Sequence, residues 1–192
     1  MTARAVGLVT VGCSWGGLIA LERLLPTVPS RVRAPIVIAQ HRVAQASPLA
    51  SLLGRFTTRP VTEAEDKEAI CPDRVYLAPP DYHLLVEPGH FALSTEGPVR
   101  YSRPSIDALF ESAADAYADR LVAIVLTGAN DDGADGARAV ARRGGRVVVQ
   151  NPTTAERDVM PAAALEAVPN ATVLPVEEIG LWLADLWREV PA

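Results

Sequence analysis

Apolar, β-branched runs alternate along the chain with runs that repeat apolar residues at helical spacing. The first kind has the length and composition of strands, and the second kind is typical of amphipathic helices. The predicted strands are 6–12, 35–40, 74–78, 91–94, 121–127, 145–150 and 172–174. The predicted helices are 16–25, 47–56, 105–118, 134–143, 160–167 and 177–188. This alternation favours an α/β fold with parallel strands.

Two segments carry the pattern most clearly. The run "LVAIVLT" at 121–127 is apolar without alternation, as expected of a strand that a parallel sheet buries on both faces. The run "RPSIDALFESAADAY" predicts a helix with Ser105 as its N-cap. Its apolar face is formed by Ile106, Leu109, Phe110 and Ala113.

The segment between 57 and 104 differs from the rest because it is rich in proline and in short extended pieces. We expect it to carry a small antiparallel hairpin at an edge. The sequence has no internal repeat, low-complexity tract or linker. We therefore predict one α/β domain over 1–192, with a mostly parallel sheet and helices on both faces.

Composition and charge exclude several classes of protein. A chain of 192 residues can bury one sizeable core. The net charge of −5 gives no electrostatic footprint for nucleic acid. No apolar run reaches the roughly 18–20 residues of a membrane span, and the first apolar run reads as a strand, not a signal peptide. Cys13 and Cys71 form neither a disulfide framework nor a zinc pattern, which favours a cytoplasmic protein.

Polar side chains follow three of the predicted strands. Ser14 follows the first strand, His41 the second, and Asp131, Asp132 and Asp135 follow the fifth. The carboxyl ends of parallel strands meet at one edge of a sheet, which is where such folds gather functional groups. Serine, histidine and aspartate are the parts of an acyl-transfer triad: the hydroxyl attacks, the imidazole takes its proton, and the carboxylate fixes the tautomer.

The glycines around the serine have a physical reason in this hypothesis. Gly12, Gly16 and Gly17 allow a sharp turn and close packing of a helix on the strand, which exposes the Ser14 hydroxyl. Amides at the start of helix 16–25 would point toward a developing oxyanion. The chain order Ser–His–Asp differs from the Ser–acid–His order of α/β-hydrolases, so a triad here would belong to another fold.

The same residues allow other interpretations. Ser14 can be a helix N-cap, His41 a hydrogen-bonded core residue, and Asp132 a turn residue. A dinucleotide-binding domain would need G-x-G-x-x-G and an acidic residue after the second strand, whereas the chain has "GCSWGG" and "QHR". A metal site is disfavoured because the aspartate spacing does not fit a calcium loop and no second metal-spaced histidine is present.

Other polar residues have structural interpretations. Gln40 and Gln150 are expected to be strand-end hydrogen-bonding residues. Cys13 is expected to be a small buried residue facing away from its neighbour Ser14, because adjacent residues of a strand point to opposite faces. Arg103 either orients a carboxylate or caps a turn.

Several motifs in order resemble the catalytic domain of the chemotaxis protein-glutamate methylesterases, which also act as protein-glutamine glutaminases. "VGCSWGGLIALERLL" is similar to the nucleophile turn and first helix of that family, and "PIVIAQHR" to its second strand with the catalytic histidine. "VLTGANDDGADGARAVARRGG" resembles its aspartate loop. The remaining similar stretches are "VYLAPPDYHLLV", "RPSIDALFESAA" and "VVVQNPTTAERDVMPAAALEA".

The resemblance implies roles for three residues: Ser14 as nucleophile, His41 as base and Asp132 as the orienting acid. It selects Asp132 because the family's aspartate directly precedes the first glycine after the "LTG" strand end. His83 matches a family histidine that we interpret as structural or pocket-lining. The implied fold is a parallel-sheet α/β domain, in agreement with the strand pattern.

The implied activity is removal of methyl groups from glutamate γ-methyl esters, with glutamine deamidation as a second reaction. The resemblance implies no cofactor and no metal. It implies a methylated chemoreceptor or related signalling protein as the partner, and a separate receiver protein of a phosphorelay as a second partner. The alternative is a non-catalytic or altered-specificity interaction domain that keeps this fold.

The chain departs from the family pattern in two places around the site. Trp15 replaces a small residue, often Thr, directly after the nucleophile, and Ala129 with Asn130 replaces Met-Gly after "LTG". The methionine position is tied to the family's oxyanion pocket, and a backbone N–H at Ala129 can still donate there. Trp15, Gly16 and Ala129 are therefore the expected oxyanion and pocket residues.

A third departure concerns the start of the chain. The family's usual chemotaxis enzyme carries an N-terminal receiver domain and a linker, whereas this sequence begins at the first strand of the catalytic domain. We therefore expect a stand-alone catalytic domain that is not regulated by phosphorylation in cis.

Overall fold

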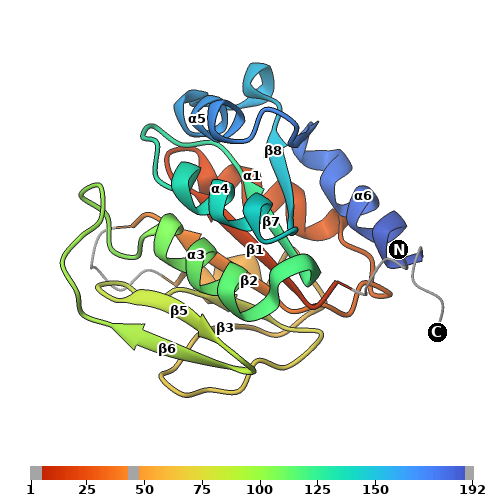
Figure 1. Ribbon diagram of the computed structural model, residues 1–192. Coiled ribbons are helices and arrows are strands. Elements are labelled where there is room, and N and C mark those ends of the chain that lie inside the picture. The colour runs from red at the N-terminus through yellow and green to blue at the C-terminus, as the bar shows by residue number, and fades with distance from the viewer. Residues whose placement is uncertain (1–5, 43–47, 189–192) are drawn as a thin grey trace.

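The computed structural model describes residues 6–42 and 48–188 (Figure 1). Residue 47, where helix 47–56 is expected to begin, and both ends of the predicted domain lie outside the described residues. The main sheet has the strand order β3-β4-β2-β1-β7-β8-β9, and neighbouring strands run parallel. Its strands are β1 (Leu8–Cys13), β2 (Ile36–Gln40), β3 (Val61–Glu63), β4 (Val75–Leu77), β7 (Leu121–Val125), β8 (Arg146–Gln150) and β9 (Thr172–Leu174).

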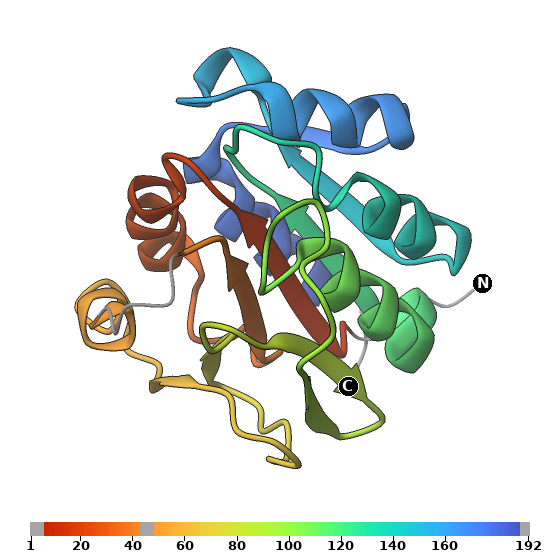
Figure 2. The same ribbon diagram turned by 90° about the vertical axis from the view of Figure 1, so that its left-hand side faces the viewer.

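Helices cover both faces of this sheet (Figures 1 and 2). One face is covered by α1 (Gly17–Leu24), α2 (Leu49–Leu53) and α6 (Val176–Arg188). The other is covered by α3 (Ile106–Tyr117), α4 (Ala134–Arg142) and α5 (Val159–Ala167). The predicted fold class is confirmed.

The alternation of side chains along the strands creates two hydrophobic cores. In β1, Val9 and Val11 pack with α1 and α6, whereas Leu8 packs with α3. Every residue of β7 is buried, as the unbroken apolar run predicted. No helix among the described residues has both the length and the apolar character to cross a membrane.

The segment between 57 and 104 holds the predicted hairpin, β5 (His83–Glu87) and β6 (His90–Ser94). The expected position at an edge is wrong, because the two strands form a separate sheet. Their buried residues Leu84 and Val86 pack in the core of α3, so the hairpin covers a face instead of extending an edge. The edge strand next to β4 is β3, which has three residues and was not predicted because so short a strand shows no periodicity.

The order of the strands determines where the sheet has its topological switch point. From β1 the chain moves to β2 on one side, and β7 pairs with β1 on the other. Helix α1 follows β1 on one face and α4 follows β7 on the opposite face. The carboxyl ends of β1 and β7 are therefore a topological switch point, the position where open α/β sheets bind ligands.

Candidate active site

Hydrogen bonds between backbones hold the three polar strand ends together. The N–H of Ser14 donates to the carbonyl of Thr127 at 2.9 Å, and the N–H of His41 donates to the carbonyl of Cys13 at 3.0 Å. The loops after β1, β2 and β7 thus leave the sheet in fixed register.

The structure brings Ser14, His41 and Asp132 into one chain of contacts. Ser14 Oγ lies 3.1 Å from His41 Nδ1, and His41 Nε2 lies 2.7 Å from Asp132 Oδ2. The other two candidate aspartates, Asp131 in the loop and Asp135 in the first turn of α4, pair with Arg100 instead. Asp132 is thus the loop aspartate that contacts the imidazole.

Asp132 is fully buried, and its carboxylate lies against the N-terminus of α3. Its Oδ2 also accepts from the N–H of Ile106 at 2.8 Å, and its Oδ1 accepts from the N–H of Asp107 and from Ser105 Oγ, both at 3.0 Å. Burial alone would raise the pKa of Asp132, but hydrogen bonds from His41 and from these helix amides outweigh burial and lower the pKa below its ordinary value. The carboxylate therefore stays ionised at neutral pH.

An ionised Asp132 determines the tautomer of the histidine. A carboxylate accepts only, so Nε2 of His41 carries the proton in that contact. The lone pair of neutral His41 is then on Nδ1, which faces the Ser14 hydroxyl. This arrangement can remove a proton from the hydroxyl while the carboxylate stabilises the imidazolium that forms.

A second hydroxyl shares the same ring nitrogen. Ser102 Oγ lies 3.2 Å from His41 Nδ1. Ser102 is placed there by a tight turn in which Val99 and Ser102 exchange backbone hydrogen bonds. Arg100 and Tyr101 have positive φ values in this turn, which non-glycine residues rarely adopt, so no sequence pattern indicated Ser102.

The turn after Ser14 requires glycine at two positions. Gly16 precedes α1 with a φ of 76° in the left-handed region, where a side chain would also meet Glu156. A Cβ on Gly17 would lie 2.8 Å from Cys13 Sγ. These glycines let the helix start directly against the strand, which leaves the Ser14 side chain at the sheet edge.

Three backbone amides of the expected oxyanion residues have no hydrogen-bond acceptor among the described residues. They are the N–H groups of Trp15, Gly16 and Ala129. By contrast, the N–H of Gly128 donates to the carbonyl of Arg157 at 3.1 Å. Amide N–H groups that the fold leaves unused beside a nucleophile are the donors from which an oxyanion hole is made.

The Trp15 side chain turns toward the loop before α5. Its Nε1 donates to Glu156 Oε1 at 2.8 Å, and the Arg157 guanidinium lies over the ring at 5.6 Å. The side chain remains 58% exposed. The indole is thus held on the domain surface at the rim of the site.

Cys13 packs among the apolar residues of the α1 face, away from the Ser14 and His41 side chains. Burial raises the pKa of its thiol to about 12. The thiol therefore stays protonated and supplies no competing nucleophile at neutral pH.

Two aspartates bind the backbone amides at two helix starts. Asp132, just before α4, accepts from amides at the start of α3, and Asp107 of α3 accepts from amides at the start of α4. Asp107, in the first turn of α3, accepts from the N–H of Gly133 at 2.9 Å and of Gly136 at 2.7 Å, at the start of α4. Burial raises the pKa of Asp107 to about 6, and the nearby charge of Asp132 acts in the same direction. Arg100 Nε donates to Asp107 at 3.2 Å and partly offsets this effect.

The other polar residues from the sequence have structural contacts. Buried His83 accepts from the N–H of Ser105 at 3.1 Å and donates to the carbonyl of Gly97 at 3.0 Å. Gln150 accepts from the N–H of Thr127 at 2.9 Å, as expected of a strand-end residue. Gln40 Oε1 is buried without a partner among the described residues, so that expectation is wrong for its oxygen.

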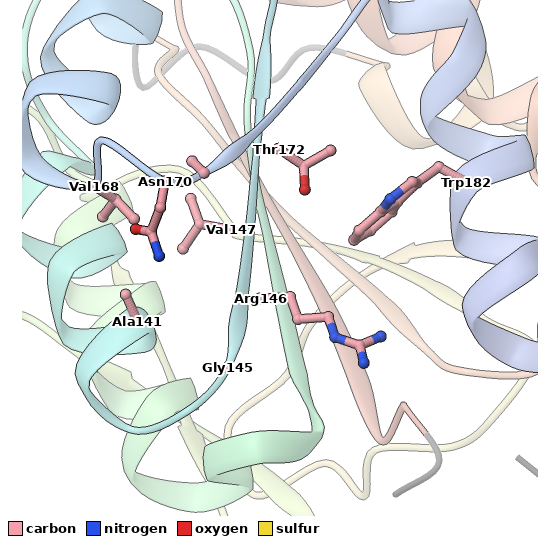
Figure 3. A pocket seen from close by; sticks show the side chains of 9 residues that line it. Ala141, Gly145, Arg146, Val147, Val168, Asn170, Thr172 and Trp182 are labelled. Atoms are coloured by element: carbon pink, nitrogen blue, oxygen red, sulfur yellow. The ribbon is translucent and has the colours of Figure 1, made fainter. Parts of the chain in front are cut away.

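Two cavities lie at opposite ends of the sheet. A cavity of about 450 Å³ opens beside His41 and Ser102. The other, of about 320 Å³, is shown in Figure 3, where Arg146 and Thr172 mark the starts of β8 and β9 and Trp182 reaches in from α6. Only the first cavity adjoins the Ser14–His41–Asp132 contacts. Within the described ranges, no three His, Cys, Asp or Glu side chains are grouped so as to hold a metal ion.

Comparison with known proteins agrees with this fold. The CheB methylesterase family model matches residues 9–183. The chain is 44% identical to a putative protein-glutamate methylesterase/protein-glutamine glutaminase of Leptospira interrogans, over 89% of this chain and 90% of that protein. It is 38% identical to a protein-glutamate methylesterase/protein-glutamine glutaminase of Paramagnetospirillum magneticum, over 93% of this chain but 49% of that protein.

The fold also matches a crystal structure. It superposes on the CheB methylesterase catalytic domain of Thermotoga maritima with a TM-score of 0.89 and 33% identity, covering 95% of this chain and 100% of that domain. The resemblance seen in the sequence is therefore confirmed over most of the chain. The chain spans about half the length of several relatives and nearly all of the Leptospira protein.

Proposed function

The chain belongs to the CheB methylesterase family, and we propose that it is a serine hydrolase acting on glutamate γ-methyl esters of signalling proteins. Its relatives are named protein-glutamate methylesterases/protein-glutamine glutaminases. The observation that carries the proposal is the contact chain from Ser14 through His41 to buried Asp132.

The reaction proceeds in two halves. Ser14 Oγ attacks the ester carbonyl carbon while His41 Nδ1 takes the hydroxyl proton, which gives a tetrahedral oxyanion. The C–O bond to the methoxy group then breaks, and the proton on Nδ1 goes to the departing methanol. Water attacks the acyl-serine, His41 takes and returns a proton as before, and glutamate and Ser14 are released. With a glutamine substrate the same steps release ammonia.

The oxyanion is stabilised by backbone amides in this proposal. The unused N–H groups of Trp15 and Ala129 are the donors, so the side chain at position 129 contributes nothing and alanine suffices. The departure from the family's methionine therefore leaves this function intact.

The proposed partner is a methylated chemoreceptor or a related signalling protein. A methyl ester on a folded partner suits a site at the open edge of a sheet, and methanol is small enough to leave without a deep pocket. A separate receiver protein is the proposed regulator of this activity.

Replacement of the nucleophile tests the mechanism. We expect Ser14→Ala to lower kcat/KM for a γ-methyl glutamyl ester by about three or more powers of ten, because the covalent step is lost. Ser51→Ala, at an exposed position of α2, is the matched control. A serine-directed phosphonate should label the wild type but not Ser14→Ala, as mass spectrometry of the labelled peptide can determine.

Retained turnover in Ser14→Ala would exclude the mechanism. The second candidate function, an altered-specificity or non-catalytic interaction domain, is favoured by Trp15 beside the nucleophile. A non-catalytic domain would neither cleave an activated ester nor react with the phosphonate, whereas an altered-specificity hydrolase would react with the phosphonate but not cleave the γ-methyl glutamyl ester.

A further inference from the structure

The cavity beside His41 has a chemical character that ester hydrolysis does not require. Besides His41, it is lined by Arg42, Asp81, Pro98, Tyr101, Ser102 and Arg103. Hydrolysis of a neutral methyl ester uses none of the charged groups among these. The two arginines therefore call for a separate explanation.

Arg42 is the more buried of the two. Its side chain is nine-tenths buried, and its Nη2 donates to Glu63 Oε1 at 2.6 Å and to the carbonyl of Ala78 at 3.0 Å. Its Nη1 is also buried, but has no acceptor among the described residues. A buried guanidinium with an unpaired donor is unfavourable, and an anion placed beside it in the cavity would stabilise its charge.

Arg103 lines the same cavity and also has a donor without a partner in the described part of the chain. Its Nη1 donates to the carbonyls of Thr95 and Glu96, both at 3.0 Å, whereas its buried Nε has no acceptor in the described ranges. The carboxylate of Asp81 lies 3.9 Å from Nη2 and is mostly exposed, so this pair is weak. Two planar cations with free donors match the geometry of a carboxylate.

We propose that this cavity binds a carboxylate carried by the substrate, on an acidic residue close to the esterified glutamate. The inference rests on the proposed function, since the cavity adjoins the base of that reaction. The protein carries a net charge of −5, which disfavours acidic segments, whereas the lining of this cavity holds two arginines and one aspartate. Arg42 and Arg103 are thus specificity-determining residues.

Two synthetic peptides test the proposal. Each contains one glutamate γ-methyl ester, flanked in one peptide by glutamates and in the other by glutamines. We expect the wild type to favour the glutamate-flanked peptide in kcat/KM by about tenfold, the factor that one charge-assisted hydrogen bond supplies. In Arg42→Gln the ratio should fall to about one, with the loss in KM.

Further variants complete the comparison. Arg103→Gln, at a less buried position, should lower the ratio as well and keeps the test open if Arg42→Gln does not fold. Arg146→Gln is the matched control, because Arg146 lines the cavity at the opposite end of the sheet (Figure 3). It should leave the ratio unchanged. Affinities of both peptides for Ser14→Ala, measured by fluorescence anisotropy, give the preference without any turnover.

The outcomes separate this inference from the proposed function. Equal kcat/KM for both peptides, or a preference that survives in both arginine variants, overturns the carboxylate site and leaves the hydrolase intact. A wild type that cleaves neither peptide overturns the proposed function, and the anisotropy preference and its loss in Arg42→Gln on the Ser14→Ala background then decide the carboxylate site.

Discussion

At the scale of single residues, two neighbouring buried aspartates titrate in opposite directions. Asp132 has a lowered pKa because its hydrogen bonds with His41 and the α3 amides outweigh burial. Asp107 has a pKa raised to about 6 because burial and the charge of Asp132 outweigh Gly136 and Arg100. The carboxylate that contacts the imidazole is thus ionised at neutral pH, and its charge contributes to the raised pKa of Asp107.

This difference predicts a pH dependence of stability. Between 3.8, the ordinary value, and about 6, the folded protein binds more protons at Asp107 than the unfolded chain does. Rising pH therefore lowers the free energy of unfolding in this window. We expect the wild type to lose stability relative to Asp107→Asn between about pH 4 and 6, with a constant difference above pH 7.

Urea unfolding of both proteins at each pH measures this difference. The opposite effect belongs to Asp132, whose lowered pKa gives stability that is lost only as the pH falls below about 4. If the free energy of unfolding of the wild type instead rises relative to that of Asp107→Asn between pH 4 and 6, the assignment to Asp107 is wrong.

Trp15 also has a testable role at this scale. The indole is held at the rim by Glu156 and Arg157 and stays largely exposed, so it is available to a large partner. We expect Trp15→Thr to change kcat/KM for a methylated protein much more than for a small activated ester. Trp15→Phe, which keeps a ring without the Nε1 donor, separates partner contact from the bond to Glu156. Equal effects on both substrates would mean that Trp15 only supports the turn.

At the scale of elements, the start of α3 packs directly on β1. A Cβ on Gly12 would overlap the side chain of Ile106, whose N–H donates to Asp132 at 2.8 Å. We expect Gly12→Ala to lower the free energy of unfolding by about 1–3 kcal/mol, as overpacking does, and to lower kcat by displacing the helix that holds Asp132. Gly97→Ala is the matched control, since its Cβ would meet nothing within 4 Å.

Thermal unfolding and ester hydrolysis of both glycine variants check this prediction. A Gly12→Ala protein with unchanged kcat would show that Asp132 does not depend on the position of α3.

The elements themselves were largely predictable from the sequence. The long buried strands and most amphipathic helices appeared within one or two residues of the predicted bounds, as for 105–118 against Ile106–Tyr117. The helix predicted over 47–56 is shorter, because α2 ends at Leu53. Ser105 is the N-cap as predicted, accepting from the N–H of Ala108 at 3.3 Å. The three-residue β3 and the place of the hairpin were not predictable, because they depend on tertiary packing and not on a repeating pattern.

The candidate site divides in the same way. Ser14, His41 and Asp132 follow long strands, so the sheet rule places them together before any coordinates are known. Ser102 and Arg100 reach the site through a turn with positive φ at non-glycine residues. No residue type in that stretch predicts such a turn, so the contacts of Ser102 and Arg100 could not be predicted from the sequence.

At the scale of the whole molecule, Arg100 joins two distant parts of the chain. It lies in the turn between the hairpin and α3, and it pairs with Asp107 of α3 and with Asp131 and Asp135 of the loop around the start of α4. Without this guanidinium, three carboxylates next to Asp132 would repel one another. We expect Arg100→Gln to lower the Tm by several degrees, which corresponds to about 1–3 kcal/mol, and to lower kcat/KM for a small ester.

Salt distinguishes this cause from a loss of packing. Repulsion between the carboxylates is screened at 1 M salt, where the Debye length is about 3 Å, so the Tm gap between Arg100→Gln and wild type should narrow there. Arg138→Gln is the control: among the described residues Arg138 pairs with Asp135 at an exposed position, where an ion pair contributes little. Differential scanning calorimetry at low and high salt measures both variants. A gap that is independent of salt would mean that Arg100 acts through the packing of its aliphatic stem and not through its charge.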